Sequence, residues 1–377
     1  MAGIYIHIPF CKQACHYCDF HFSTSLVQKE EMIQALMHEL HVRKNYLQGQ
    51  PISSIYFGGG TPSILSVAEI ERIIQAIQSN FSSEQNIEIT LEANPDDINL
   101  QKAIDWRKAG INRLSIGIQS FDEGILKWMN RAHSAKEALE AMENVRLAGF
   151  ENISIDLIYG VPQPNHEKWR EDLTLAMQFK PEHISSYSLT IEEKTAFGNW
   201  VRKGKMRKPE DDFAAVQYEM LVETLRQNSY EQYEVSNFCH SENYSRHNSS
   251  YWLQQHYLGI GPSAHSYDGQ SRQWNVASNT KYLKLLQSGG DYFQREVLSE
   301  SDKVNDYLLT ALRTRWGLDY DKLRTEFQLG TDWPGWENFA TLIAQKLAEP
   351  TEKGIRLSSR GRLMADAITS KLFVDSI

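Results

Sequence analysis

The feature that most constrains the fold of this 377-residue chain is a regular alternation of β-rich runs and helix-like segments in its first half. Alternating elements of this kind require parallel strands joined by right-handed crossovers. The pattern therefore predicts an α/β array of six parallel strands, arranged either as an open sheet or as a partial barrel. The β-rich runs occupy 4–8, 52–57, 87–91, 113–118, 153–158 and 183–189, and the helical periodicity occupies 29–42, 67–78, 100–108, 135–148 and 167–179.

The pattern changes after about residue 195. Residues 230–267 hold six of the 17 tyrosines and four of the 12 histidines, which sets this stretch apart from the rest of the chain. From residue 301 onward the periodicity predicts a mainly helical, winged-helix-like module with one short strand at 355–358. We therefore expect three parts: a barrel at 1–195, an aromatic and histidine-rich connecting segment at 196–300, and a C-terminal module at 301–377.

Composition narrows the class of protein. The chain has 39 basic and 48 acidic residues, a net charge of -9, whereas nucleic-acid binding usually needs a basic face. Apolar residues make up 41% of the chain, but no apolar run approaches the length of a membrane span. The first residues lack the basic and apolar regions of a signal peptide. We therefore expect a globular, cytoplasmic protein that does not bind nucleic acid.

Three of the four cysteines, Cys11, Cys15 and Cys18, lie within eight residues just after the first predicted strand. Three thiolates on one loop can hold three irons of a [4Fe-4S] cluster and leave the fourth iron open to a small molecule. The alternative is a zinc site completed by His16, His21 or a distant residue. The spacing predicts metal ligation by these thiolates in either case.

Polar residues follow the other predicted strands, where a β/α barrel carries its chemistry. Gly58, Gly59 and Gly60 come after the second strand and allow close approach of the backbone to a ligand. Asp156 sits inside the apolar run 153–158, where a buried carboxylate is costly without a partner. An inward-facing lumen that holds a polar ligand would relieve that cost.

These motifs resemble those of radical S-adenosylmethionine (SAM) proteins and, more narrowly, the family of oxygen-independent coproporphyrinogen III oxidase and its heme-chaperone relatives. The matching stretches are 5–11, 17–20, 58–62, 92–95, 117–121 and 156–162, and looser similarity extends over almost the whole chain. The resemblance implies a partial (β/α)6 barrel with a [4Fe-4S] cluster on Cys11, Cys15 and Cys18, and SAM chelating the open iron. It implies SAM contacts at nine positions: Tyr5, Tyr17, Gly59, Gly60, Thr61, Glu92, Gln119, Arg131 and Asp156.

Three features favour the heme-chaperone branch over the oxidase. Phe20 stands where the oxidase has a further cysteine, and the chain lacks the oxidase's extension before the first strand. Residues 246–252 also match the H-N-x-x-Y-W motif of the heme chaperones. The resemblance thus predicts that His247, Tyr251 and Trp252 contact heme, because imidazole ligates heme iron and aromatic rings pack on a porphyrin. His240, His256 and His265 are alternative ligands, and a purely structural role of the motif is the competing interpretation.

The function that the resemblance implies is that of a chaperone that binds heme, a [4Fe-4S] cluster and SAM and passes heme to acceptor proteins, respiratory ones among them. The alternative is the radical SAM oxidase itself, which performs an oxidative decarboxylation in porphyrin biosynthesis. Whether SAM cleavage is coupled to the function stays open, and no catalytic residue is assigned.

Overall fold

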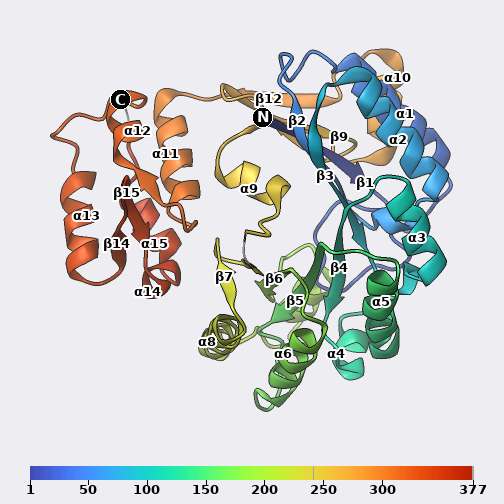
Figure 1. Ribbon diagram of the computed structural model, residues 1–377, viewed down its shortest axis with the longest axis horizontal. Coiled ribbons are helices and arrows are strands. Elements are labelled where there is room, and N and C mark those ends of the chain that lie inside the picture. Colours follow the sequence, from blue (N-terminus) through green and yellow to red (C-terminus); the bar gives the residue numbers. More distant parts are fainter. Residues whose placement is uncertain (241, 376–377) are drawn as a thin grey trace.

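The computed structural model describes residues 1–240 and 242–375, and a strongly curved sheet of twelve strands forms its centre (Figure 1). Six consecutive strands at the middle of the sheet run parallel, as the alternating pattern predicts. The sheet and the helices outside it form the α/β barrel-like fold expected from the sequence. The six strands are β1 (Ala2–Ile8), β2 (Ile52–Gly59), β3 (Ser83–Ala93), β4 (Arg113–Gln119), β5 (Ile153–Tyr159) and β6 (His183–Ser188).

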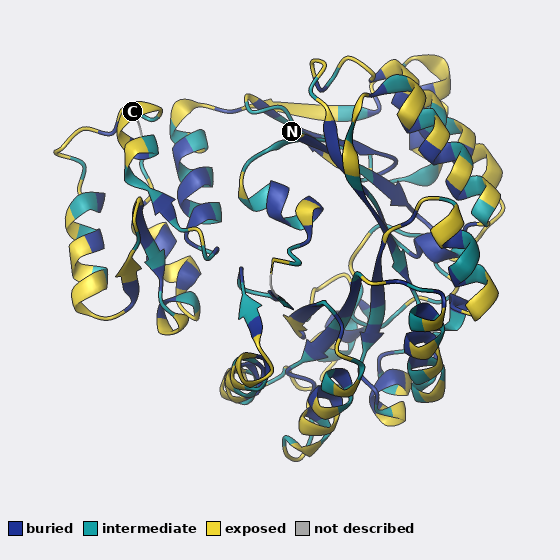
Figure 2. Cartoon of the chain, in the orientation of Figure 1, coloured by how far each residue is buried: buried dark blue, intermediate teal, exposed yellow. Residues whose placement is uncertain are grey.

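Helices cover the convex face of this sheet, and their outward sides are exposed while the strands are buried (Figure 2). Ser66 and Ser134 begin two of them with capping boxes, in which Glu69 and Glu137 reach back to the capping residue. The helices between the strands are α1 (Lys29–Val42), α2 (Val67–Asn80), α3 (Leu100–Lys108), α4 (Glu123–Trp128), α5 (Ala135–Leu147) and α6 (Glu167–Phe179), with single 3-10 turns η1 (Pro62–Ile64) and η2 (Pro95–Asp97).

Residues 196–300 add six strands to the same sheet. At one edge, β8 (Asn237–His240) and β7 (Tyr230–Gln232) follow β6; at the other, β9 (His256–Ile260) pairs in parallel with β1 and leads to β10 (His265–Tyr267), β11 (Ser271–Asn275) and β12 (Phe293–Val297). The helices of this segment are α7 (Ala196–Arg202), α8 (Asp211–Gln227), α9 (Arg246–Trp252) and α10 (Asn279–Ser288). The connecting segment of the sequence analysis is thus continuous with the barrel sheet at both of its edges.

The buried carboxylate of Glu39 links residues 261–282 to the barrel through hydrogen bonds. Glu39 of α1 is fully buried and accepts hydrogen bonds from the backbone N–H of Gly261, the Asn275 amide and the Tyr282 hydroxyl. Arg43, one turn further along α1, lies 3.6 Å from the same carboxylate. Since an unpartnered buried charge is costly, these four partners make the docking of 261–282 against α1 specific.

Residues 300–375 form a separate, mainly helical module with its own core, seen at the left of Figure 1. It contains a three-stranded antiparallel sheet in the order β13-β15-β14. Its elements are α11 (Glu300–Ala311), β13 (Leu318–Asp319), α12 (Tyr320–Thr325), α13 (Gly335–Ala344), β14 (Ala348–Pro350), β15 (Gly354–Leu357), α14 (Ser359–Arg362) and α15 (Ala365–Ser370). In the described part of the chain, every helix is too short or too polar to cross a membrane.

Candidate functional site

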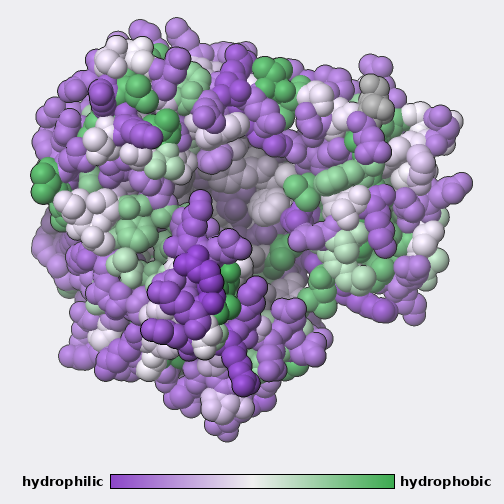
Figure 3. Space-filling view, turned by 180° about the vertical axis from the view of Figure 1, so that it is seen from behind, coloured by the Kyte–Doolittle hydropathy of each residue, from purple (hydrophilic) through white to green (hydrophobic). Residues whose placement is uncertain are grey.

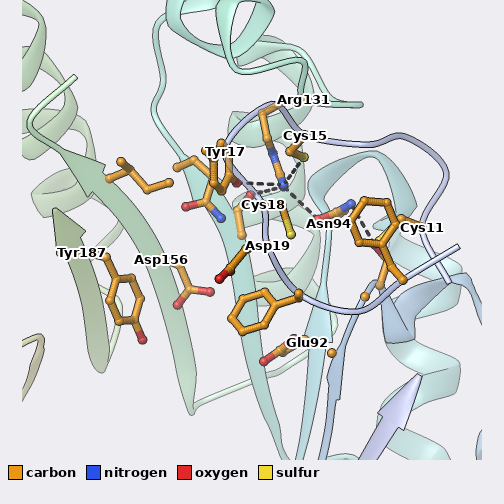
Figure 4. A pocket seen from close by; sticks show the side chains of 18 of the residues that line it. Cys11, Cys15, Tyr17, Cys18, Asp19, Glu92, Asn94, Arg131, Asp156 and Tyr187 are labelled. Atoms are coloured by element: carbon orange, nitrogen blue, oxygen red, sulfur yellow. Dashed lines mark hydrogen bonds between the residues drawn. The ribbon is translucent and has the colours of Figure 1, made fainter. Parts of the chain in front are cut away.

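A cavity of about 440 Å³ lies at the carboxyl ends of the barrel strands (Figure 4). The three neighbouring cysteines line it, together with eight of the nine residues for which the sequence predicts SAM contacts. The ninth, Tyr5, lies in a smaller cavity that shares part of its lining with the first. Seen from behind, the surface is hollowed near the centre of the molecule (Figure 3). The eight residues are Tyr17, Gly59, Gly60, Thr61, Glu92, Gln119, Arg131 and Asp156.

The cysteine loop is tied to its surroundings mainly through its backbone. The Cys11 N–H donates to the Ser23 carbonyl, which closes the loop at its base. The His16 ring bonds the Trp128 carbonyl at 2.9 Å, and the Gln13 side chain reaches Asn130 at 2.8 Å. These two bonds help to hold the loop in place.

The three thiols are free, and each is partly exposed to the cavity. The Thr61 hydroxyl donates to Cys11 Sγ and an Arg131 Nη donates to Cys15 Sγ, both at 3.4 Å. Burial raises the pKa of Cys11 to about 11 and that of Cys18 to about 12. A thiolate at these positions needs a compensating positive charge, which a bound metal centre supplies.

The glycine run brings the second strand against the first. Gly59 has φ of +107°, and a Cβ there would lie 2.6 Å from the His7 ring. A Cβ at Gly60 would lie 2.6 Å from the Phe10 carbonyl oxygen, while its N–H donates to Ile8. The N–H groups of Gly60 and Thr61 are thus hydrogen-bonded within the protein and are not free to bind a ligand.

Arg131 is the positively charged side chain among the cavity-lining residues. One Nη donates to Asn94 Oδ1 and to the Gly117 carbonyl, both at 2.8 Å, and the other lies 3.4 Å from the Tyr17 hydroxyl. Figure 4 shows the guanidinium between the cysteine loop and Asn94. Its fixed position suits recognition of a carboxylate.

Two partly buried carboxylates, Glu92 and Asp156, line the same cavity as Arg131. Burial raises the pKa of Glu92 to about 7, although Tyr56 donates a 2.7 Å hydrogen bond to it. Burial likewise raises the pKa of Asp156 to about 6, against a weak 3.3 Å bond from Ser115. These groups suit ribose hydroxyls or the positive sulfonium of a ligand, because either would offset the cost of their charge.

The aromatic and histidine motif lies below this cavity, on α9, and covers the amino ends of the strands. His247 is 2% exposed; Ser54 Oγ bonds its Nδ1 and the Tyr251 hydroxyl bonds its Nε2, both at 2.8 Å. Its ring stacks on Tyr56 at 5.0 Å, and burial lowers its pKa to about 3. Both ring nitrogens are thus hydrogen-bonded within the protein.

The other predicted candidates lie apart from the cysteines. His265 is exposed and stacks on Trp274, His256 bonds Gln50, and His240 packs against the Tyr230 ring at a tilt. Cys239 is fully buried in β8, away from the cavity lining. His21 Nε2 bonds Asn279, and both His7 ring nitrogens are engaged, one by the Tyr5 hydroxyl and the other by the His21 carbonyl.

Several lining residues were not singled out from the sequence. Tyr56 lies in a predicted strand and outside every motif that we identified, yet it donates a hydrogen bond to Glu92. Ser115, Ser185 and Tyr187 also line the cavity, and period-2 alternation would have placed them on the lumen side of their strands. Arg113, which lines the smaller cavity, was not predicted either, although a charged residue at the start of a buried strand is unusual.

The site and fold define a radical SAM protein, and comparison with known proteins agrees. Residues 5–176 match the radical SAM superfamily. The chain is 33% identical to the heme chaperone HemW of Lactococcus lactis over 99% of this chain and 97% of the relative, and 31% identical to HemW of Bacillus subtilis over 98% of each. The solved structure of coproporphyrinogen III oxidase (HemN) from Escherichia coli shares the fold, with a TM-score of 0.85 at 23% identity over 99% of this chain and 90% of that one.

The chain therefore belongs to the HemW family of the radical SAM superfamily.

Proposed function

We propose that the chain is a heme chaperone that holds a [4Fe-4S] cluster and SAM in the barrel, binds heme, and transfers it to acceptor proteins. The observation that carries the proposal is near full-length similarity to heme chaperones together with three free thiols on the cavity wall. The donor set fits a cluster, since hydrogen bonds from Thr61 and Arg131 to two of the sulfurs favour thiolates. When bound, the cluster would supply an open iron for SAM.

A single zinc ion is the alternative for the thiols. Among the described residues, no three His, Cys, Asp or Glu side chains converge on one point that would hold one metal ion. The match to the radical SAM superfamily supports the cluster over zinc.

The residues around the cavity would then hold SAM by complementary charge. Arg131 binds the carboxylate, the loop carbonyls at Gly59 and Gly60 accept from the amino group, and Glu92 or Asp156 accepts from the ribose or faces the sulfonium. Gln119 has φ of +66°, and this backbone conformation turns the chain at the cavity wall. Tyr17 and Thr61 complete the side nearest the thiols.

Heme contact through His247 is part of the proposal, and the hydrogen bonds of α9 define how to test it. If iron replaces Tyr251 at Nε2, Tyr251→Phe should tighten heme binding, because the competing hydroxyl is gone. His247→Ala should then shift or weaken the Soret band without loss of cluster iron. Unchanged heme spectra in both variants would assign the motif a structural role and move the search to His265 or His240.

The experiment that tests the function separates it from the oxidase. Anaerobically reconstituted protein is incubated with heme and, separately, with coproporphyrinogen III, SAM and a reductant. We expect a growing Soret band, transfer of that heme to a heme-free acceptor protein, and no vinyl-bearing product. Steady formation of protoporphyrinogen IX would contradict the assignment. The expectation that none forms rests in part on Phe20, which lines the cavity, is 68% exposed and stands where the oxidase motif has a cysteine.

A further inference from the structure

A second, smaller cavity of about 170 Å³ lies beneath the first, between the amino ends of the strands and α9. We call it the lower chamber. It shares Tyr56, Ser115, Ser185 and Tyr187 with the main cavity, so the two cavities are adjacent. Figure 4 shows Tyr187 beside Asp156 at this junction. The lower chamber is lined by Tyr5, Tyr56, Arg113, Ser115, His183, Ser185, Tyr187, Asn237, Ser245, His247, Asn248 and Tyr251.

The lining of the lower chamber carries a net positive charge. Arg113 is its one cationic side chain, and none of its lining residues is a carboxylate. Burial and the Arg113 charge lower the pKa of His183 and of His247, so both imidazoles are neutral. The remaining groups are hydroxyls, phenols and amides, which can donate hydrogen bonds to an anion.

Arg113 itself has no close partner. It is 2% exposed, and its Nε forms no hydrogen bond among the described residues, nor does its guanidinium form an ion pair there. The carboxylates that feel the Arg113 charge, Glu92 and Asp156, form no ion pair with it and accept hydrogen bonds from Tyr56 and Ser115 instead. A buried cation without a contacting counter-charge is costly, so a ligand that supplies one would be favoured.

We propose that the lower chamber binds a carboxylate, with the Arg113 guanidinium as its positive partner. A planar guanidinium matches a carboxylate in two parallel hydrogen bonds. A volume of about 170 Å³ admits a small carboxylate or one carboxylate arm of a larger ligand, and it is too small for a tetrapyrrole ring. The carboxylate therefore comes either from a free small acid or from a propionate of heme held above, the second source resting on the proposed function.

The first experiment uses formate as the probe of the free source. Calorimetry and thermal unfolding are measured with sodium formate against sodium chloride at equal ionic strength. We expect saturable formate binding by the wild-type chain, at least tenfold weaker binding in Arg113→Met, and partial recovery in Arg113→Lys. Arg72→Met, which removes an exposed arginine paired with Glu30, is the control and should bind formate as the wild type does.

The same variants distinguish a ligand site from a structural role. An arginine that only stabilises the fold should lower the melting temperature when it is replaced. If the partner of Arg113 is a bound anion, the melting temperature of ligand-free Arg113→Met should equal or exceed that of the wild type, because the substitution removes a buried charge that has no contacting partner. A destabilised Arg113→Met with unchanged formate binding would overturn the proposal.

The second experiment compares heme with heme dimethyl ester, in which both propionates are blocked. A propionate source predicts that Arg113→Met weakens heme binding at least fivefold and leaves binding of the ester unchanged. A formate response without this difference assigns the chamber to a free acid. If neither formate nor heme binding depends on Arg113, the proposal is wrong. Absence of heme binding by the wild-type chain would contradict the proposed function alone, because the formate response is read separately.

Discussion

Replacement of Glu92 by glutamine measures the free energy that the fold loses by holding an ionised carboxylate inside the barrel. The pKa of this group is raised from an ordinary value of 4.5 to about 7, chiefly by burial. Between these two values the folded chain binds a proton that the unfolded chain has released, so the free energy of unfolding falls as the pH rises from about 4.5 to 7. Glutamine keeps an oxygen that can accept from Tyr56 but does not titrate.

The magnitude follows from the pKa difference. Each unit of pKa corresponds to about 1.4 kcal/mol, so ionisation of Glu92 costs the wild-type fold up to about 3 kcal/mol above pH 7. Water in the cavity makes this an upper limit. Relative to the wild type, Glu92→Gln should therefore be about equally stable near pH 4.5 and more stable by about 1 to 3 kcal/mol at pH 8.

The assay is urea unfolding of the ligand-free chain at four pH values between 5 and 8.5, with the difference between variant and wild type plotted against pH. Asp156→Asn is the matched control. Its stability difference from the wild type should change over a lower pH range, between about 3.8 and 6. The reasoning is refuted if the Glu92→Gln difference does not change with pH. At pH 8 the same variant should bind SAM more weakly, because the carboxylate that faces the ligand has become neutral.

Three further outcomes follow from the site. Cys11→Ser should lose most of the roughly four irons bound after anaerobic reconstitution, while Cys239→Ala, buried in β8, should retain them. Arg131→Ala should lower SAM affinity by about 1.5 to 3 kcal/mol in calorimetry, and equal affinity would show that the carboxylate binds elsewhere. Serine at Gly59 should prevent folding of the loop, seen as a lower melting temperature, because φ is +107° and the His7 ring fills the space.

The sequence predicted the central fold because local patterns carry that information. Six strands and five helices lie where alternating periodicity placed them, and the cysteine loop follows β1 as expected. The six strands from 230 to 297 were not predicted, since each has only three to five residues and too few for a period to be recognised. Their place in the sheet depends on pairing with β1 and β6, which are distant in sequence.

The site was predictable to the extent that its residues follow strands. Eight of the nine expected SAM positions share one cavity, because the carboxyl ends of parallel strands meet there. The surroundings of His247 were not predictable, since its partner Ser54 is 193 residues away. A motif shows which side chains are present, whereas only the packing of α9 shows that both imidazole nitrogens are already bonded.

The charges of the two cavities are arranged in layers, and this order has a consequence for binding. Arg131 lies at the level of the thiols, Glu92 and Asp156 lie between, and Arg113 lies in the lower chamber. Arg113 is buried and the other three side chains are partly buried. Because the opposite charges do not contact one another, the ligand-free fold bears part of their desolvation cost. A ligand with its own alternating charges would relieve that cost in only one orientation, with its carboxylate at Arg131 and its cationic centre at the carboxylates. We therefore expect the order of Arg131 above Glu92 and Asp156 to orient a zwitterionic ligand such as SAM, so that loss of any one of these three side chains should weaken orientation as well as affinity.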